Sequence, residues 1–278
     1  MFHEGEVAAQ ERAGFLYVRG MIFPAMTAQH QQFFADLPLL FIARLDATGA
    51  PQAAMLTHPA GFIYTDNAAY LGIDTRVLAN WPLWEALQPG DRIGSLGLDF
   101  ATRRRNRING TVVACDDAQV VIEVAQSFGN CPQYIRRFHW QGLPAEAVTV
   151  TPLTQVPAEV LAECQTFFIA TGNGDLGLDI SHRGGPAGFL RQQGEQLVFA
   201  DFPGNRYMNT LGNLLLAPRC ALLLTDFIRG EAIHIQGEAQ VNWLEDEQGR
   251  SQREVVIQPT RIDRLYGGAA WQAVPFET

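Results

Sequence analysis

The sequence contains no lysine, and all 20 of its basic side chains are arginines. The absence of lysine excludes Schiff-base chemistry on a lysine, including the usual covalent anchoring of pyridoxal phosphate. Any anion site must therefore use arginine, whose planar guanidinium suits phosphate oxygens. The net charge of −9 argues against a general nucleic-acid surface, because such surfaces are broadly basic.

Cysteines and long apolar runs are also scarce. The four cysteines form no CxxC pair, which is typical of reduced, buried thiols rather than of a disulfide framework or a zinc site. The start of the chain lacks the basic and apolar regions of a signal peptide. The longest apolar stretch, from Leu214 to Leu224, is interrupted by Pro218 and is too short to span a bilayer. We therefore expect a cytoplasmic protein with no membrane partner.

Short identities recur along the chain at one fixed spacing. Phe41-Ile42-Ala43 returns as Phe168-Ile169-Ala170, an offset of 168 − 41 = 127 residues. Asp99-Phe100 returns as Asp226-Phe227 at the same offset, as do Arg92 as Arg219 and Gly110 as Gly237. Several matches at the same offset predict an internal duplication.

Each copy is predicted to contain the same run of elements. A helix (27–34 or 157–165) precedes an apolar strand (39–45 or 167–171) and a turn rich in Gly, Asp and Asn, which indicates a hairpin. Thr27 and Thr154 lie near the expected helix starts. Another strand (62–65 or 196–200), a helix (78–87 or 208–217) and two strands (93–99 with 108–114, or 221–225 with 233–241) follow.

This order predicts a mainly β fold, a small β-barrel with short helices, in two tandem units. We expect an N-terminal extension (1–26), a first unit (27–139), a Pro-containing linker (140–156) and a second unit (157–278). The 172–177 segment matches GxGxxG, but strand-like alternation follows it where a dinucleotide-binding fold needs a helix. A hairpin turn is therefore favoured there over a Rossmann motif.

Two polar segments of the second copy could bind an anion. Residues 181–185, Ser-His-Arg-Gly-Gly, end a predicted strand and offer a hydroxyl, an imidazole and a guanidinium. Residues 201–210 join a strand to a helix, where backbone N–H groups attract phosphate. The alternatives are a polar surface turn in the first case and helix capping in the second.

The first copy carries two further candidates. Residues 103–107, Arg-Arg-Arg-Asn-Arg, form the densest basic patch, and alternation sends Arg103, Arg105 and Arg107 to one side and Arg104 to the other. A solvated basic hairpin is the alternative to phosphate binding. Residues 126–134 combine amides, Gly, Pro and two aromatics, so they could line a planar ring. The six histidines show no metal-ligand spacing, and no metal site is predicted.

Together these segments resemble the flavin-nucleotide-binding proteins related to pyridoxamine 5′-phosphate oxidase. In the second copy the similar segments are 168–171, 179–189, 202–206 and 209–214, and in the first copy 102–110 and 126–135. The likeness covers most of residues 27–245. It implies tandem split β-barrels, FMN as the cofactor lying between barrels, and a homodimer.

The resemblance also implies which residues hold FMN. Its phosphate and ribityl chain would contact Ser181 and Arg183 on the strand, with Asn205, Arg206, Asn209 and Thr210 after the next one. The full set of residues expected to bind the cofactor is Ser181, His182, Arg183, Gly184, Asp201, Asn205, Arg206, Asn209, Thr210, Arg104, Gln126 and Ser127.

The chain departs from the oxidase itself, which uses lysine for phosphate and has a C-terminal substrate segment not evident here. The leading interpretation is therefore an FMN-dependent oxidoreductase acting on an unknown small molecule, with NAD(P)H or a redox protein as partner. No catalytic residue is assigned. The alternatives are a non-enzymatic flavin carrier or sensor, and a haem-binding split barrel with His58, His182 or His234 as axial ligand.

Overall fold

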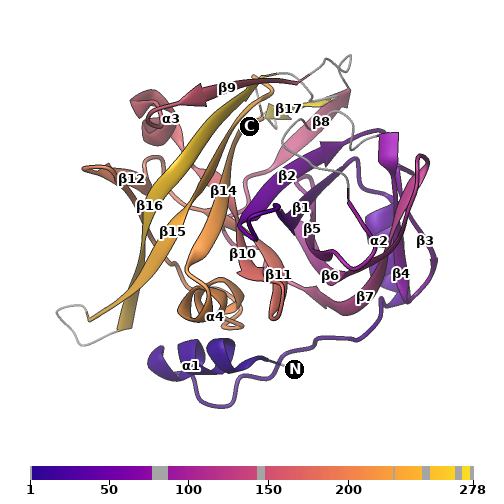
Figure 1. Cartoon of the computed structure of the whole chain (residues 1–278), viewed down its shortest axis with the longest axis horizontal. Coiled ribbons are helices and arrows are strands. Elements are labelled where there is room, and N and C mark those ends of the chain that lie inside the picture. The colour runs from indigo at the N-terminus through magenta and orange to yellow at the C-terminus, as the bar shows by residue number, and fades with distance from the viewer. Residues whose placement is uncertain are drawn as a thin grey trace.

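Two curled antiparallel sheets, lying side by side, make up most of the molecule (Figure 1). The computed structural model describes residues 2–76, 87–142, 148–227, 229–245, 251–266 and 271–275. The first sheet contains β1 (Leu39–Leu45), β2 (Pro51–Thr57), β3 (Ile63–Asn67), β4 (Tyr70–Asp74), β5 (Arg92–Asp99), β6 (Arg104–Cys115) and β7 (Gln119–Gly129). The second contains β10 (Thr166–Asn173), β11 (Gly177–Gly184), β12 (Leu190–Gln193), β13 (Gln196–Ala200), β14 (Arg219–Asp226), β15 (Glu231–Glu245) and β16 (Ser251–Tyr266).

The two sheets have the same strand order. It is β2-β1-β5-β6-β7-β4-β3 in the first and β11-β10-β14-β15-β16-β13-β12 in the second, so each strand has a counterpart in the other copy. Both orders are antiparallel throughout. The predicted fold class, mainly β in two repeated barrel-like units, is confirmed.

The predicted linker between the two units, residues 140–156, contains strand residues that pair with the C-terminal part of the chain. β9 (Thr149–Leu153) pairs with β16, and β8 (Phe138–Gly142) pairs with β17 (Trp271–Pro275) near the C-terminus. The domain boundaries at 27–139, 140–156 and 157–278 stay a prediction. The GxGxxG segment forms the β10–β11 hairpin, in which Asn173 pairs with Gly177.

Strands β1 and β10 are buried on both faces, which explains their unbroken apolar sequences. One face of each strand points into the core of its own unit. The opposite faces meet in a third core between the units, where Phe41 and Phe168 stack with ring centroids 3.5 Å apart. The duplication thus produces an internal interface that is itself a hydrophobic core.

Four helices of the described residues cover the sheets: α1 (Glu4–Arg12), α2 (Ala28–Ala35), α3 (Ala158–Glu163) and α4 (Asn209–Leu216). Thr27 caps α2 as expected, because its Oγ1 accepts from the His30 N–H at 3.2 Å. Thr154 does not cap α3, whose N-cap is Pro157. The helix predicted over 78–87 falls almost entirely outside the described residues. Helix α1 packs against α4 at the edge of the second unit (Figure 1).

Candidate functional site

Two strands from different units, β6 and β11, approach each other where the sheets meet. Alternate residues on a strand point to the same side, so β6 presents Arg105, Arg107 and Asn109 to the second unit. Strand β11 contributes Asp179 and Ser181, and α4 contributes Asn209. We call Arg107, Asn109, Asp179, Ser181 and Asn209 the inter-unit cluster.

Buried hydrogen bonds hold this cluster together. Arg107 Nη1 donates to Asp179 Oδ1 and to Asn209 Oδ1, both at 3.2 Å, and Arg107 Nη2 donates to Ser181 Oγ. Asn109 Nδ2 donates to Asp179 Oδ1 at 2.7 Å. Burial lowers the pKa of the Arg107 guanidinium, and the ion pair with Asp179 opposes that shift. The pairing satisfies a charge whose burial alone would be costly.

One end of the cluster is rich in arginine. Arg183 and Arg253 both donate to the carboxylate of Asp201, the latter from Nε at 2.9 Å. Arg105 Nη1 lies 3.1 Å from His182 Nδ1, and His182 Nε2 lies 2.7 Å from Thr166 Oγ1. Burial, with Arg105 and Arg183 nearby, lowers the pKa of His182 well below its ordinary value, so the imidazole is neutral. Two guanidinium groups, those of Arg183 and Arg253, therefore share one carboxylate, while that of Arg105 lies against an imidazole.

A small cavity of about 50 Å³ lies at this end, lined in part by Arg105, His182, Arg183 and Gly184. We call it the arginine pocket. The Nε atoms of Arg105 and Arg183 are buried without a hydrogen-bond partner among the described residues. Its electrostatics and its two orphaned donors suit a small anion.

A larger cavity of about 340 Å³ lies at the other end, lined in part by Glu6, Asn109, Gln126 and Asp179. We call it the amide pocket. Asn109 Nδ2 also donates to Gln126 Oε1 at 3.1 Å, while Asn109 Oδ1 is buried with no partner in the described part of the chain. The pocket thus offers amide groups and a free acceptor to a ligand that carries hydrogen-bond donors.

The structure brings most of the expected residues together. Ser181 belongs to the cluster, and His182, Arg183 and Gly184 line the arginine pocket, where Arg183 pairs with Asp201. Asn209 bonds to Arg107, and Thr210 Oγ1 donates to Ser181 Oγ at 2.9 Å. Gln126 lies at the amide pocket.

The remaining four expected residues lie elsewhere or at the margin. Asn205 accepts from the backbone of Tyr207 at 3.1 Å, and Arg206 is exposed with its guanidinium carbon 5.0 Å from the centre of the Phe15 ring. Arg104 and Ser127 point to the opposite face of the first sheet. There Arg104 lies 5.2 Å from the centre of the Phe33 ring, and Ser127 Oγ lies 2.7 Å from His30 Nδ1.

The expected set of cofactor-binding residues left out four participants. Arg107 belongs to the basic patch considered for phosphate binding, Asn109 lies two residues after it, and Asp179 precedes Ser181 by two residues, so the strand period could have added all three. Glu6, from the N-terminal extension, has no such signal. Its Oε1 accepts from Asn209 Nδ2, which brings a second carboxylate to the cluster.

The histidines proposed for haem do not favour that alternative. Both ring nitrogens of His182 have hydrogen-bonding partners, and the adjacent arginine pocket is far below the 300–1,000 Å³ of ordinary cofactor sites. His234 is 1% exposed, and its Nε2 accepts from the Ala53 N–H at 3.2 Å. His58 is exposed.

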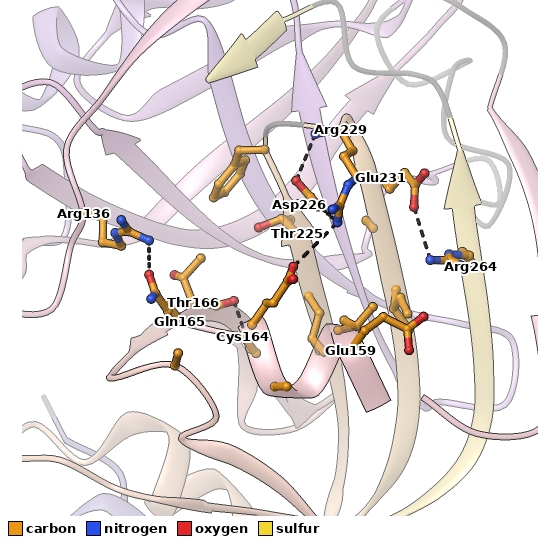
Figure 2. Close-up of a pocket in the computed structure, with 18 of the residues that line it drawn as sticks. Arg136, Glu159, Cys164, Gln165, Thr166, Thr225, Asp226, Arg229, Glu231 and Arg264 are labelled. Atoms are coloured by element: carbon orange, nitrogen blue, oxygen red, sulfur yellow. Dashed lines mark hydrogen bonds and ion pairs between the residues drawn. The ribbon is translucent and has the colours of Figure 1, made fainter. Parts of the chain in front are cut away.

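A cavity of about 490 Å³ lies away from the cluster, between α3 and the β14–β15 hairpin (Figure 2). Two of the arginines that line it are paired with carboxylates: Arg229 lies 3.0 Å from Asp226, and Arg264 lies 3.4 Å from Glu231. Burial raises the pKa of Cys164, on its wall, to about 12, so this thiol is not a ready nucleophile. None of the residues expected to bind a cofactor lines this cavity.

No family model matches the chain, and no curated protein matches it. Among solved structures it is similar to an F420 reductase, with 13% identity over 40% of this chain and 98% of the other, at a TM-score of 0.29. A putative pyridoxamine 5′-phosphate oxidase from Lactobacillus delbrueckii matches with 14% identity over 40% and 97%, at a TM-score of 0.33. A FAD-binding protein from Mesorhizobium loti matches with 9% identity over 43% and 98%, at a TM-score of 0.29.

In the described part of the chain, no helix is long and apolar enough to cross a membrane. All four cysteines are free thiols.

Proposed function

We propose that this chain is a flavin-binding protein that holds FMN between its two units and acts as an oxidoreductase on a small molecule. One observation carries the proposal. Ser181 and His182, which the resemblance assigns to FMN, lie against Arg107 and Arg105 of the other unit, and Arg107 also pairs with Asp179. The alternation of the basic patch indicated these two arginines without any resemblance. Such convergence of polar groups from distant segments is typical of a binding site.

The polar groups present fit the parts of FMN in a definite order. Arg183 and Arg105 would hold the phosphate, since the arginine pocket has surplus positive charge and unpartnered donors. Ser181, Asn209 and Thr210 would contact the ribityl hydroxyls. Asn109 and Gln126 would face the polar edge of the ring system from the amide pocket. The fit is incomplete at one point, because Glu6 stands at Asn209 between the two pockets.

When bound, FMN would supply the hydride or electron chemistry, and the chain's own residues would bind, orient and shield it. The ion pair between Arg107 and Asp179 and the one between Arg253 and Asp201 would keep the polar groups in place. The titratable groups of the cluster are engaged with neighbours, so no general acid or base is assigned. NAD(P)H or a redox protein would deliver electrons.

That engagement also favours a second candidate, a non-enzymatic flavin carrier or sensor. The two differ in one measurement, the oxidation of NADH or NADPH by the FMN-loaded protein. Turnover supports the oxidoreductase, and tight binding without turnover supports the carrier. A homodimer and a cytoplasmic location also belong to the proposal, and the free thiols agree with a reducing compartment.

The direct test of binding compares FMN with riboflavin, which lacks the phosphate. Each is titrated into the purified protein and followed by flavin fluorescence. We expect FMN to bind at least tenfold more tightly, because only its phosphate can use the arginine pocket. Failure to take up either flavin would refute the proposed function, and equal affinities would remove the arginine pocket from the site.

A further inference from the structure

Residues 2–26, which we call the N-terminal strap, run across the site just described. Near its start, α1 places Glu6 in the site, where the side chain is only 3% exposed. Glu6 Oε1 accepts from Asn209 Nδ2, and Oε2 accepts from the His3 N–H at 2.9 Å. Burial and the nearby Asp179 raise the pKa of Glu6, so this carboxylate occupies a position unfavourable to its charge.

The backbones of α1 and α4 are in direct contact. A Cβ atom on Gly5 would lie 2.3 Å from the carbonyl oxygen of Gly212, and one on Gly212 would lie 2.5 Å from the Glu6 nitrogen. Only glycine at both positions permits this approach. The pair of glycines is therefore what allows Glu6 to reach Asn209.

Further along, the strap covers the arginine end. The Phe15 ring lies 5.0 Å from the Arg206 guanidinium carbon and 6.0 Å from that of Arg253. Tyr207, which follows Arg206, accepts from Gln10 Nε2 at 3.2 Å through its carbonyl, and from the Met21 N–H at 3.0 Å through its hydroxyl. The strap thus contacts the residues after β13 as well as α4.

The two ends of the strap are held in different ways. Side chains attach α1 to α4, including His3, whose Nε2 lies 2.9 Å from Asn213 Oδ1, whereas backbone pairing attaches the far end. Phe23 exchanges two backbone hydrogen bonds with Ser127 on β7, at 2.9 and 2.8 Å. The preceding stretch is exposed, with Tyr17 at 95%, and it turns through positive φ at Gly14 and Tyr17. The buried apolar side chains of α1 and its C-cap are Ala9 and Ala13, so α1 itself contributes little apolar surface to its contact with α4.

We propose that the N-terminal strap is a built-in competitor of the anionic ligand, with the Glu6 carboxylate at the place the ligand must cross and Phe23 as the fixed end about which α1 lifts. This inference rests on the proposed function and deepens it. With the strap down, Glu6 separates the arginine pocket from the amide pocket. With α1 lifted, the two pockets join along Ser181, Asn209 and Thr210, and FMN takes the place of Glu6.

Two variants remove the proposed competition by different means. Gly5→Leu prevents the contact between helices without altering any residue proposed to touch FMN, and Glu6→Ala removes the carboxylate. Glu11→Ala, an exposed carboxylate on the same helix, is the matched control. We expect both test variants to bind FMN at least tenfold more tightly than wild type, with the control unchanged.

The outcomes separate this inference from the proposed function. If neither the wild type nor any variant binds FMN, the proposed function fails. If all bind FMN with equal affinity, or the test variants bind more weakly, the competitor role is overturned while flavin binding stands. Limited trypsin digestion gives a second reading, in which FMN accelerates cleavage after Arg12 in α1. Slower or unchanged cleavage would contradict displacement of the strap.

Discussion

Arg183 on β11 and Arg191 on β12 carry the same guanidinium group in different surroundings. Arg183 is part of the arginine pocket, where it pairs with Asp201 and keeps an unpartnered Nε. Arg191 pairs with Glu254 on the surface. Comparing the two residues separates the contribution of a guanidinium group in the site to FMN affinity from the general effect of losing a positive charge.

Arg183→Ala is expected to weaken FMN binding by about 1.5–3 kcal/mol, the range for a charge-assisted hydrogen bond, or roughly ten- to a hundredfold. It should have little effect on riboflavin, which has no phosphate. Fluorescence titration with both flavins measures this, with Arg191→Ala as control. A loss of the same size for both flavins would mean that Arg183 acts through the fold rather than through the phosphate.

A second residue-scale prediction concerns His234, buried beside the first unit. Burial, and to a smaller extent Arg261, lowers its pKa to about 4, against Asp263 and Asp46, which raise it. Because the native state resists protonation, this contribution to stability is complete above the unfolded pKa of about 6.5 and is lost as pH falls towards 4. The loss amounts to about 3 kcal/mol, and His182 acts in the same direction.

Denaturant unfolding between pH 7.5 and 4.5 checks the sign and the size of this effect. His234→Gln should flatten the fall in unfolding free energy with decreasing pH, and the exposed His58→Gln serves as the matched control. Glu6, whose raised pKa acts in the opposite sense, is present in every variant and cancels in the comparison. Identical slopes for wild type and His234→Gln would disprove the assignment.

Individual residues also show what the alternation of side chains along a strand can and cannot predict. It correctly separated Arg104 from Arg105 and Arg107, but it fixes only which side chains share a face, not which face meets the second unit. Arg104 and Ser127 were therefore expected at the site, and they face α2 instead. Glu6 could not be predicted, because its contact with Asn209 joins residues 203 positions apart.

At the scale of elements, local chemistry decided which boundaries were predictable. β1 and β13 begin and end at the expected residues, since each is an apolar run bounded by turn or cap signals. β16 was not predicted, because its sequence is charged and contains Pro259. Pairing with β15 supplies its order, with an irregularity between Gln236 and Gly237 opposite that proline.

The helix starts give a matched pair of tests at this scale. Thr27→Ala removes the side-chain cap of α2 and is expected to lower the free energy of unfolding by about 1 kcal/mol. Thr154→Ala removes an exposed threonine that caps nothing and should change it by less than about 0.5 kcal/mol. Chemical denaturation measures both. A larger loss for Thr154 than for Thr27 would contradict the capping assignment.

At the scale of the whole molecule, the sequence predicted the duplication but not the interface that the two units form. A common offset of 127 predicts two units, and says nothing of how they meet. The interface brings β5 and β6 of the first unit against β11 of the second, and β14 and β15 of the second against β2 of the first. The two halves of this interface are related by the repeat.

Only one half keeps the polar site. At the offset of 127, Ser181, Arg183, Arg105 and Arg107 correspond to Ala54, Leu56, Ala232 and His234. Ala54 and Leu56 belong to the apolar core of the first unit, and Ala232 belongs to the core between the units. The second half therefore lacks the guanidinium groups for a phosphate, and we expect one FMN per chain.

The most direct test is a crystal structure of the chain with FMN bound. The account predicts one FMN per chain, with its phosphate against Arg105 and Arg183 and its ring system beside Asn109 and Gln126. It also predicts that Glu6 has moved away from Asn209. FMN at the opposite half of the interface, or in the cavity between α3 and the β14–β15 hairpin, would contradict it.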